Sequence, residues 1–311
     1  MEIFSFGLIL NYLILILLIL LSISFLTLLE RKVLGILQDR KGPNKVVLGG
    51  LIQPIGDGIK LFVKEFIWIY KSNFYIYILG PMLSMIIMLM CWIFYDFIYE
   101  FFMTSFSLFL LISLLSLSVY SFMLSGWTSS SMYSLFGSLR SISQTVSYEV
   151  SLIFLLMFQF FFVKTFNFYD VVMFQQSFNF LMILFFVFWL IFILILAELN
   201  RTPFDLVEGE SELVSGFNVE YLSSLFALIF LGEYGMMLFF FNFLIIFFIG
   251  HFFSILFFLL FMFMYLGIRG VLPRVRYDKL MYLIWKGILP VSMNVLLIMF
   301  NFIIFIDIIL F

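Results

Sequence analysis

The chain has 311 residues, of which 65% are hydrophobic and 11% are charged, and its mean hydropathy is +1.23. A water-soluble globule of this size needs more polar surface than this composition supplies, so a soluble fold is excluded. The single cysteine, Cys91, and the single histidine, His251, exclude disulfides, Cys/His zinc sites, cysteine-ligated iron–sulfur clusters and bis-histidine haem. Any redox centre that serves this chain must lie in a partner.

The N-terminal apolar run is expected to be a retained membrane span. Glu2 stands where a signal peptide has Lys or Arg, and the uncharged run from Ile3 to Leu29 is too long for a signal h-region. In chain order, eight runs are able to cross ~30 Å of hydrocarbon. They lie near residues 4–29, 74–95, 104–124, 141–163, 178–197, 222–248, 252–268 and 287–306.

These runs predict an all-α membrane protein of about eight transmembrane helices. We interpret residues 1–311 as a single polytopic membrane domain, and we find no internal repeat. The seventh run is the shortest, and the fourth begins with polar residues. An even number of spans places both termini on the same side of the membrane.

The basic residues support this count. Only Lys164 falls on the side of the termini, and the positive-inside rule predicts such a bias. The other fifteen basic residues fall on the opposite side: Arg31, Lys32, Arg40, Lys41, Lys45, Lys60, Lys64, Lys71, Arg140, Arg201, Arg269, Arg274, Arg276, Lys279 and Lys286.

The first loop on the basic side, residues 30–72, contains a predicted amphipathic helix that begins at Pro54. We expect this helix to lie along the membrane interface. One face carries Ile55, Ile59, Phe62, Val63 and Phe66, and the other carries Asp57, Lys60 and Lys64. The basic stretch ERKVLGILQDRKGPNK in the same loop suits lipid headgroups, a partner surface or both. Glu30 and Arg31 could instead form an interfacial ion pair.

The second long loop, residues 198–221, carries six acidic residues against the single base Arg201. Helix capping is one explanation, with Thr202 as the cap, Pro203 at the first helical position and Asp205 as the capping acid. Capping accounts for one acid only. Crowded carboxylates could also hold protons, pair with bases of the first loop or bind a cation, although the spacing matches no EF-hand.

Ionisable residues within membrane spans are functional candidates, and here they are Glu149, Glu233 and, at a span end, Glu198. Glu149 belongs to a polar stripe on one helical face, which should face protein or water: Ser141, Gln144, Thr145, Tyr148 and Glu149. A carboxylate in a low-dielectric setting can exchange protons near neutral pH, which favours a proton path. The alternative is a structural pair between helices. The sequence has no Walker A or GxGxxG motif, so we expect no nucleotide site.

Five blocks of the sequence occur in the order and spacing of one known family. They are LLERKVLGILQDRKGPNKV (28–46), QPIGDGIKLFVKE (53–65), SLRSISQTVSYEVSL (138–152), LAELNRTPFDLVEGESELVSGFNVEY (196–221) and LPRVRYDKLMYLIWK (272–286). Together they closely resemble the subunit 1 family of mitochondrial NADH:ubiquinone oxidoreductase, respiratory complex I. The resemblance implies an eight-helix subunit that forms much of the ubiquinone channel and links quinone reduction to proton translocation.

The resemblance also implies roles for individual residues. The quinone channel would involve Arg31, Arg40, Lys41, Asp57, Lys60, Lys64, Glu198, Arg201, Asp205, Glu208, Glu210 and Glu212. The proton path would involve Glu149, Glu233 and Arg140. No residue of this chain would be a redox centre, a metal ligand or a directly catalytic group.

The expected partners and location follow from the same resemblance. FMN and the iron–sulfur clusters would lie in partner subunits, with ubiquinone as the bound substrate. The partners would be peripheral-arm subunits that carry the terminal iron–sulfur cluster, small membrane-arm subunits and lipids, without nucleic acid. The chain would lie in the mitochondrial inner membrane, with its basic side in the matrix and both termini in the intermembrane space.

Three other interpretations are considered. The homologous membrane subunit of an energy-converting hydrogenase shares the acidic path but needs no quinone pocket. A secondary transporter binds substrate between two repeats, and no repeat is found here. A passive scaffold would use the acidic residues for assembly alone.

Overall fold

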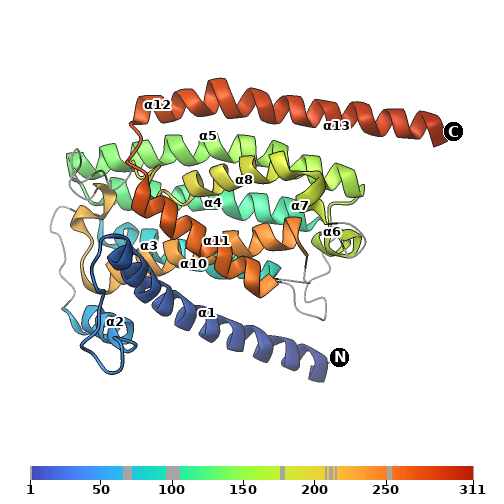
Figure 1. The fold of residues 1–311 in the computed structure, drawn as a ribbon. Helices are drawn as coiled ribbons and strands as arrows, with labels where there is room; N and C mark the ends of the chain where they lie inside the picture. Colours follow the sequence, from blue (N-terminus) through green and yellow to red (C-terminus); the bar gives the residue numbers. More distant parts are fainter. Residues whose placement is uncertain are drawn as a thin grey trace.

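The computed structural model describes residues 2–65, 72–95, 106–175, 179–206, 209, 213, 216–250 and 254–310. Within these ranges the chain is helical and contains no strand (Figure 1). The longer helices are α1 (Glu2–Leu37), α3 (Phe74–Cys91), α4 (Ser107–Thr128), α5 (Met132–Val163), α8 (Phe185–Glu198), α10 (Ser223–Phe248), α11 (Ser254–Val271) and α13 (Leu289–Leu310). The shorter elements are α2 (Gln53–Val63), η1 (Trp92–Phe94), α6 (Phe168–Gln175), α7 (Phe180–Ile183), η2 (Gly216–Glu220), α12 (Tyr277–Tyr282) and the π-helical turn η3 (Leu283–Ile288).

The structure confirms an all-α membrane protein. Seven helices of the described part are long and apolar enough to cross a membrane. The predicted fifth span is divided at Leu184 into α7 and the 14-residue α8. Backbone N–H bonds from Leu184 to Phe180 and from Phe188 to Leu184 keep the two helices nearly continuous. This interrupted segment accounts for the eighth predicted span.

Several helices extend further than their apolar runs. α1 continues beyond Glu30 and Arg31 to Leu37, and α5 begins at Met132, nine residues before the predicted start at 141. At these points some of the polar residues are buried in the bundle, such as Glu30 and Ser134, whereas Arg31 lies at the surface. Ser131 caps α5 by accepting a hydrogen bond from the backbone N–H of Ser134.

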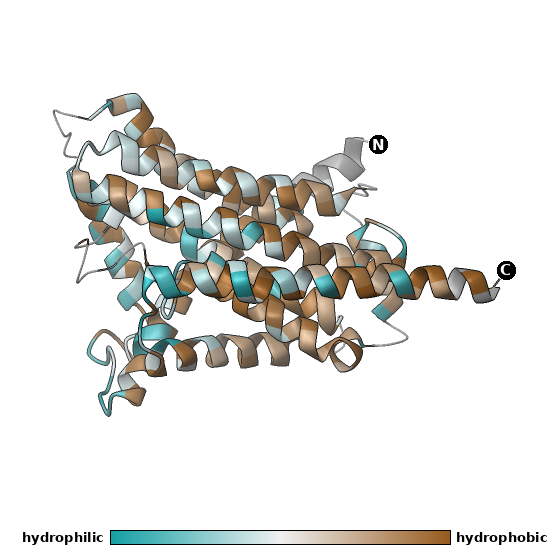
Figure 2. Ribbon diagram, turned by 90° about the horizontal axis from the view of Figure 1, so that it is seen from above, coloured by the Kyte–Doolittle hydropathy of each residue, from teal (hydrophilic) through white to brown (hydrophobic). Residues whose placement is uncertain are grey.

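α10 lies at the centre of the bundle, where it packs against α1, α3, α8 and α11. Its buried face is largely aromatic, and Phe240, Phe241, Phe247 and Phe248 are almost completely enclosed. Both chain termini lie at the same end of the bundle (Figure 1). Apolar residues cover the helices along most of their length, and polar residues gather mainly toward the opposite end (Figure 2).

Small residues allow the helices to approach closely, as is common where lipid provides no hydrophobic driving force for association. Gly80 of α3 lies against the backbone of Ser125 in α4, and Gly232 of α10 lies against Ser84 in α3. These contacts bring α3, α4 and α10 together around the site described below.

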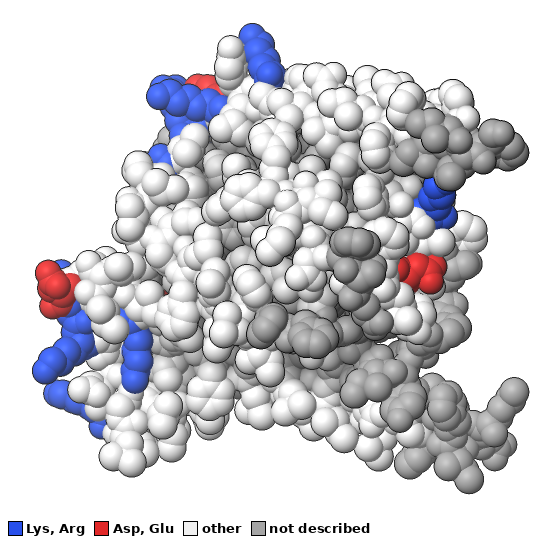
Figure 3. Space-filling model, turned by 45° about the vertical axis from the view of Figure 1, so that its right-hand side comes forward, with Lys and Arg blue, Asp and Glu red and all other residues white. Residues whose placement is uncertain are grey.

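The predicted charge asymmetry is visible in the fold. Of the fifteen basic residues predicted on one side, Lys71 lies outside the described residues, and the others lie toward the end opposite the termini. Figure 3 shows Lys and Arg gathered at one edge of the molecule, with a small charged group at the other. Lys164, at the C-terminal end of α5, lies at the end that carries the termini.

Candidate functional site at the basic end

A buried ion pair joins the acidic loop to the central helix. Arg201 is 4% exposed, and its Nη2 donates to Oε2 of Glu233 on α10 over 2.6 Å. The guanidinium also lies 5.3 Å from the ring centroid of Phe230 and 5.0 Å from that of Tyr234. Aromatic faces and a carboxylate together compensate for removing this charge from water. Arg201 and Glu233, predicted separately from two segments, therefore form one unit.

A second buried carboxylate connects three helices. Glu30 of α1 forms an ion pair with Arg269 of α11, and the Tyr234 hydroxyl of α10 donates to Glu30 Oε2 over 2.8 Å. The predicted alternative of an interfacial Glu30–Arg31 pair is wrong, because α1 turns Glu30 toward the bundle and leaves Arg31 at the surface. Tyr234 links this group to the first, since its ring contacts Arg201.

Asp205 is also paired rather than acting as a helix cap. Its Oδ2 accepts from Nη2 of Arg274 over 2.8 Å. The capping interpretation is wrong, because residues 201–206 form turns and a bend rather than a helix, and the Thr202 hydroxyl has no hydrogen-bond partner among the described residues. Arg274, the base of this pair, follows α11.

The polar stripe of α5 faces the protein interior, as predicted. Ser141, Gln144, Thr145 and Tyr148 are fully buried. The Gln144 amide donates to the carbonyl oxygens of Ala197 (2.8 Å) and Phe204 (3.0 Å). It thereby holds α5 against the end of α8 and the start of the acidic loop.

Glu149 and Glu198 lie near each other where α5 meets α8. α5 and α8 pack together, and the charge of Glu149 acts on Glu198 across this contact. Oε1 of Glu149 and Oε2 of Glu198 are buried and have no hydrogen-bond partner among the described residues. Arg140 directly precedes the polar stripe on α5. Its guanidinium lies 6.0 Å from the ring centroid of Tyr277. The structure therefore brings Glu149 next to Glu198 and places Arg140 on the α12 side of α5.

The predicted amphipathic helix forms as α2, with Pro54 in its first turn. Arg31 of α1 donates to Asp57 over 2.6 Å, and Gln53 donates to the same carboxylate over 2.9 Å. Partial burial raises the pKa of Asp57, but these hydrogen bonds and the charges of Arg31 and Lys60 outweigh it and leave the pKa below its ordinary value.

The apolar side chains of α2 are exposed, including Ile59 (60%) and Val63 (76%). A helix with such a face suits the membrane interface. Lys60 lies on α2 and Lys64 at its end, whereas Arg40 and Lys41 lie in the exposed chain after α1. Phe66, Glu208, Glu210 and Glu212 were also predicted in these loops and lie outside the described residues.

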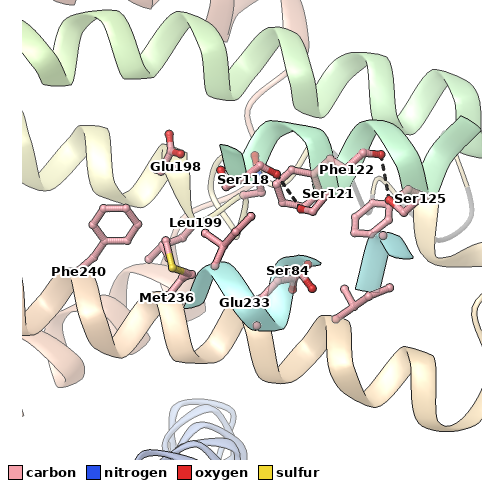
Figure 4. Close-up of a pocket in the computed structure, with 16 residues that line it drawn as sticks. Ser84, Ser118, Ser121, Phe122, Ser125, Glu198, Leu199, Glu233, Met236 and Phe240 are labelled. Atoms are coloured by element: carbon pink, nitrogen blue, oxygen red, sulfur yellow. Dashed lines mark hydrogen bonds between the residues drawn. The ribbon is translucent and has the colours of Figure 1, made fainter. Parts of the chain in front are cut away.

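A cavity of about 60 Å³ lies between these charged groups. Figure 4 shows Ser118, Ser121 and Ser125 of α4, with Met236 and Phe240 of α10 on the other side. Glu198, Asn200 and Glu233 are among its lining residues. The cavity therefore lies where the acidic loop begins and meets the middle of the bundle.

Sequence reasoning missed several members of this arrangement. Glu30, Tyr234, Arg269, Arg274 and Asn200 were not among the predicted site residues. The sequence could have indicated Glu30 and Arg269, because each is a charged residue at the end of an apolar run whose helix continues beyond it.

The fold and the site define a polytopic all-α membrane protein with a buried carboxylate–guanidinium network at its basic end. A family model described as NADH dehydrogenase matches residues 10–300. A relative from Locusta migratoria, named NADH-ubiquinone oxidoreductase chain 1, is 46% identical over 94% of this chain and 94% of its own length. A relative of the same name from Aedes aegypti is 44% identical over 91% and 92%. The chain belongs to the NADH dehydrogenase family, with the chain 1 proteins of NADH-ubiquinone oxidoreductase as its relatives.

Proposed function

We propose that this chain is a core membrane subunit of respiratory complex I, forming much of the ubiquinone channel and coupling NADH-driven quinone reduction to proton translocation. The observation that carries the proposal is the buried ionic network at the basic end. It joins the acidic loop to α10 through Arg201 and Glu233, and Glu233 lines the same cavity as Glu198. Family membership supports the subunit assignment, since the relatives are named for quinone reduction.

The proposed quinone route begins at the membrane interface near α2. The exposed apolar face of α2 suits contact with lipid, from which a quinone with an apolar tail must come. Arg31 and Asp57 fix this helix to α1, and the positive residues Arg40, Lys41, Lys60 and Lys64 lie nearby in sequence. Farther in, Glu198, Arg201 and Asp205 would line or support the channel. We also assign Glu208, Glu210 and Glu212 to the channel, on the resemblance of the sequence to the family alone.

The chemistry requires charge movement close to this network. Ubiquinone takes up two electrons and two protons to become ubiquinol. The electrons would come from FMN and iron–sulfur clusters in peripheral-arm subunits, because the sequence, with one cysteine and one histidine, lacks the ligands for a cysteine-bound cluster. Carboxylates with coupled protonation are suited to respond when the reduced quinone takes protons from its surroundings.

We assign the proton path to Glu149, Glu233 and Arg140. Glu149 interacts electrostatically with Glu198, which is the first residue of the acidic loop. Glu233 is held by Arg201 from the same loop. A change of protonation or conformation in residues 198–221 would therefore act on both membrane carboxylates.

The proposed location is the mitochondrial inner membrane. The basic end would face the matrix and dock the peripheral-arm subunits, and both termini would face the intermembrane space. Small membrane-arm subunits and lipids would cover the exposed apolar sides of the bundle.

Asp205→Asn tests the channel role, because it removes the partner of Arg274 and leaves the shape of the side chain nearly unchanged. In assembled complex, we expect ubiquinone reduction to fall about tenfold or more, equivalent to ~1.4 kcal/mol on the barrier. NADH oxidation by a water-soluble artificial acceptor should stay normal. Asp278→Asn is the control, since Asp278 belongs to an exposed pair with Arg276. Normal ubiquinone reduction in the Asp205 variant would contradict the proposal.

A further inference from the structure

We propose that the outer face of α13 docks a transmembrane helix of another subunit of the complex, through hydrogen bonds to Asn294 and Asn301. The inference rests on the subunit assignment of the proposed function, and it uses neither the quinone channel nor the proton path. The partner helix would bring polar side chains, at matching depth in the membrane, to an otherwise apolar contact.

α13 lies at the edge of the bundle, with α5 as its main neighbour (Figure 1). Ser292 and Met299 are buried on its inner side, and the rings of Phe300 and Phe161 lie 4.8 Å apart between centroids. Among the candidate membrane spans of the described residues, the span that contains α13 is the least enclosed. In an 18-residue stretch of this span 17% of the residues are buried, compared with 67% for α10. The outer side of α13 is therefore covered by lipid or by another protein.

Two amide side chains lie on this outer side. Asn294 and Asn301 are seven residues apart, which places them on one face of the helix, nearly opposite the buried Ser292. Both are exposed, and neither side chain forms a hydrogen bond to the described residues. Leu297 and Ile298 lie between them and are 57% and 66% exposed. Polar positions accordingly interrupt the apolar course of α13 (Figure 2).

The two amides lie within the hydrocarbon region of the membrane. Lys286 is the last charged residue before the apolar run 287–306 and marks the basic end of that run. At a rise of about 1.5 Å per residue, Asn294 and Asn301 lie about 12 Å and about 22 Å farther along the helix. The hydrocarbon core is about 30 Å thick, so both amides lie inside it. Acyl chains offer no hydrogen bond to an amide, and an unsatisfied amide in hydrocarbon is costly.

A transmembrane helix is the cover that supplies hydrogen bonds at this depth. Asparagine, glutamine, serine and threonine side chains hydrogen-bond across helix contacts in membranes, and most such contacts have the shallow crossing angle of coiled coils. Contacts of this kind recur every seven residues, so one partner helix would meet both Asn294 and Asn301. Gly287, seven residues before Asn294, is exposed, and a side chain there would meet no atom within 4 Å. A small residue at this point allows close approach of a partner backbone.

Lipid and a second copy of this chain are the other possible occupants of this face. Lipid would leave both amides without hydrogen bonds. A second copy would satisfy them by pairing like with like. The relatives, however, are each named as a numbered chain of one enzyme, which favours contact with a different chain.

A photoreactive side chain at position 298 identifies the occupant. Ile298 lies between the two asparagines and is exposed, so Ile298→p-benzoylphenylalanine leaves the packing of this chain intact. In purified assembled complex, we expect cross-links to a membrane-spanning segment of another subunit, identified by mass spectrometry. That segment should carry polar side chains about seven residues apart. Cross-links to lipid alone, to a second copy of this chain or to a segment without polar side chains would overturn the inference.

The double variant Asn294→Leu with Asn301→Leu tests the hydrogen bonds. Leucine is favoured in hydrocarbon, so the variant should not weaken the fold of this chain itself. As detergent is increased on native gels, we expect the cross-linked subunit to dissociate about fivefold to tenfold more readily. Lipid on this face predicts the opposite sign, and equal or stronger retention of that subunit would overturn the inference.

Asn11→Leu is the matched control. Asn11 of α1 is also an exposed asparagine, but it lies about 30 Å from Arg31 along the helix, at the far boundary of the hydrocarbon core. We expect wild-type retention of the cross-linked subunit in this variant. A loss equal to that of the double variant would show that any exposed asparagine has this effect, and the assigned face would be wrong.

Subunit retention also separates this inference from the proposed function. Normal retention in the double variant, together with the expected loss of ubiquinone reduction in Asp205→Asn, would reject the docking face and keep the channel role. Reduced retention in the double variant, together with normal ubiquinone reduction in Asp205→Asn, would keep the docking face and reject the channel role.

Discussion

Some charged residues of this protein are paired in the buried interior and others at the surface. Their contributions to the stability of the fold should therefore differ. Glu30 is 6% exposed and is shared by Arg269 and Tyr234, whereas the side chains of Arg31 and Asp57 are 53% and 36% exposed. Breaking a buried pair leaves an uncompensated charge and costs about 3–5 kcal/mol, whereas exposed pairs contribute about 0–1 kcal/mol. Glu30 and Arg31 are adjacent in sequence, but we expect only the pair formed by Glu30 to contribute strongly to stability.

This difference predicts that Glu30→Gln destabilises the protein much more than Asp57→Asn. The first change leaves Arg269 charged and without its carboxylate in the bundle, and the second removes one exposed pair. The fraction of complex that stays assembled during stepwise heating, followed on native gels, measures the effect. Equal heat sensitivity of the two variants would show that Glu30 is not a structural junction.

The sequence was sufficient to select most charged candidates but not to pair them. Glu149, Glu198 and Glu233 are identifiable because ionisable residues in apolar runs are rare and expensive. The partner of Glu30 could not be found, because Arg269 lies far along the chain and only the packing of α1 against α11 brings them together. Asp205 matched a capping pattern, but its ion pair with Arg274 replaced that role.

At the scale of elements, the ionised form of Asp57 strengthens the packing of α2 against α1. Its pKa in the folded protein lies below the ordinary value of 3.8. A lowered folded-state pKa means that the carboxylate stabilises this attachment above the unfolded pKa, and the stabilisation disappears as pH falls through the folded value. The attachment should therefore be insensitive to pH near neutrality.

A spin label at Gly56→Cys can follow this behaviour, because a side chain at Gly56 meets no atom within 4 Å. We expect constant label mobility from neutral pH down to about 3.8 and greater mobility at lower pH. Asp57→Asn should raise the mobility of the label already at neutral pH, to the level that the wild type reaches at low pH. A mobility change centred near neutral pH would refute the assigned anchor.

The packing of α5 against η2 depends on a glycine. A Cβ at Gly137 would lie 3.0 Å from both Gly216 Cα and Phe217 N, which are backbone atoms. We therefore expect Gly137→Ala to destabilise the protein by about 1–3 kcal/mol. Gly56→Ala, in open space on α2, should be neutral or stabilising by up to ~1 kcal/mol. The temperature at which quinone reductase activity is lost tests this order, and its reversal would refute the packing.

The sequence predicted the number and type of the helices better than the residues at which they begin and end. Long apolar runs identified the spans, and Pro54 with its alternating faces identified α2. The division at Leu184 was not predictable, because residues on both sides are uniformly apolar and the break lies in the backbone. The early start of α5 was missed because serines, a glycine and Arg140 interrupt the apolar residues of its first turns.

At the scale of the whole molecule, the charged end and the membrane interior are connected by a continuous set of helices. α10 carries Glu233 and packs against α1, α3, α8 and α11, while α5 carries Glu149 and packs against α8. The acidic loop contacts both helices, through Arg201 to α10 and through the Phe204 carbonyl to Gln144 of α5. Chemistry at this loop therefore has two physical routes into the bundle.

The central claim is that this connection couples quinone reduction to proton movement. The most direct test is the number of protons pumped per NADH by assembled complex carrying Glu149→Gln, reconstituted into sealed vesicles. The substitution keeps the size of the side chain and removes its titrating group. Our account predicts fewer protons pumped per NADH, with NADH oxidation by a soluble acceptor preserved. An unchanged number of protons per NADH would contradict the account.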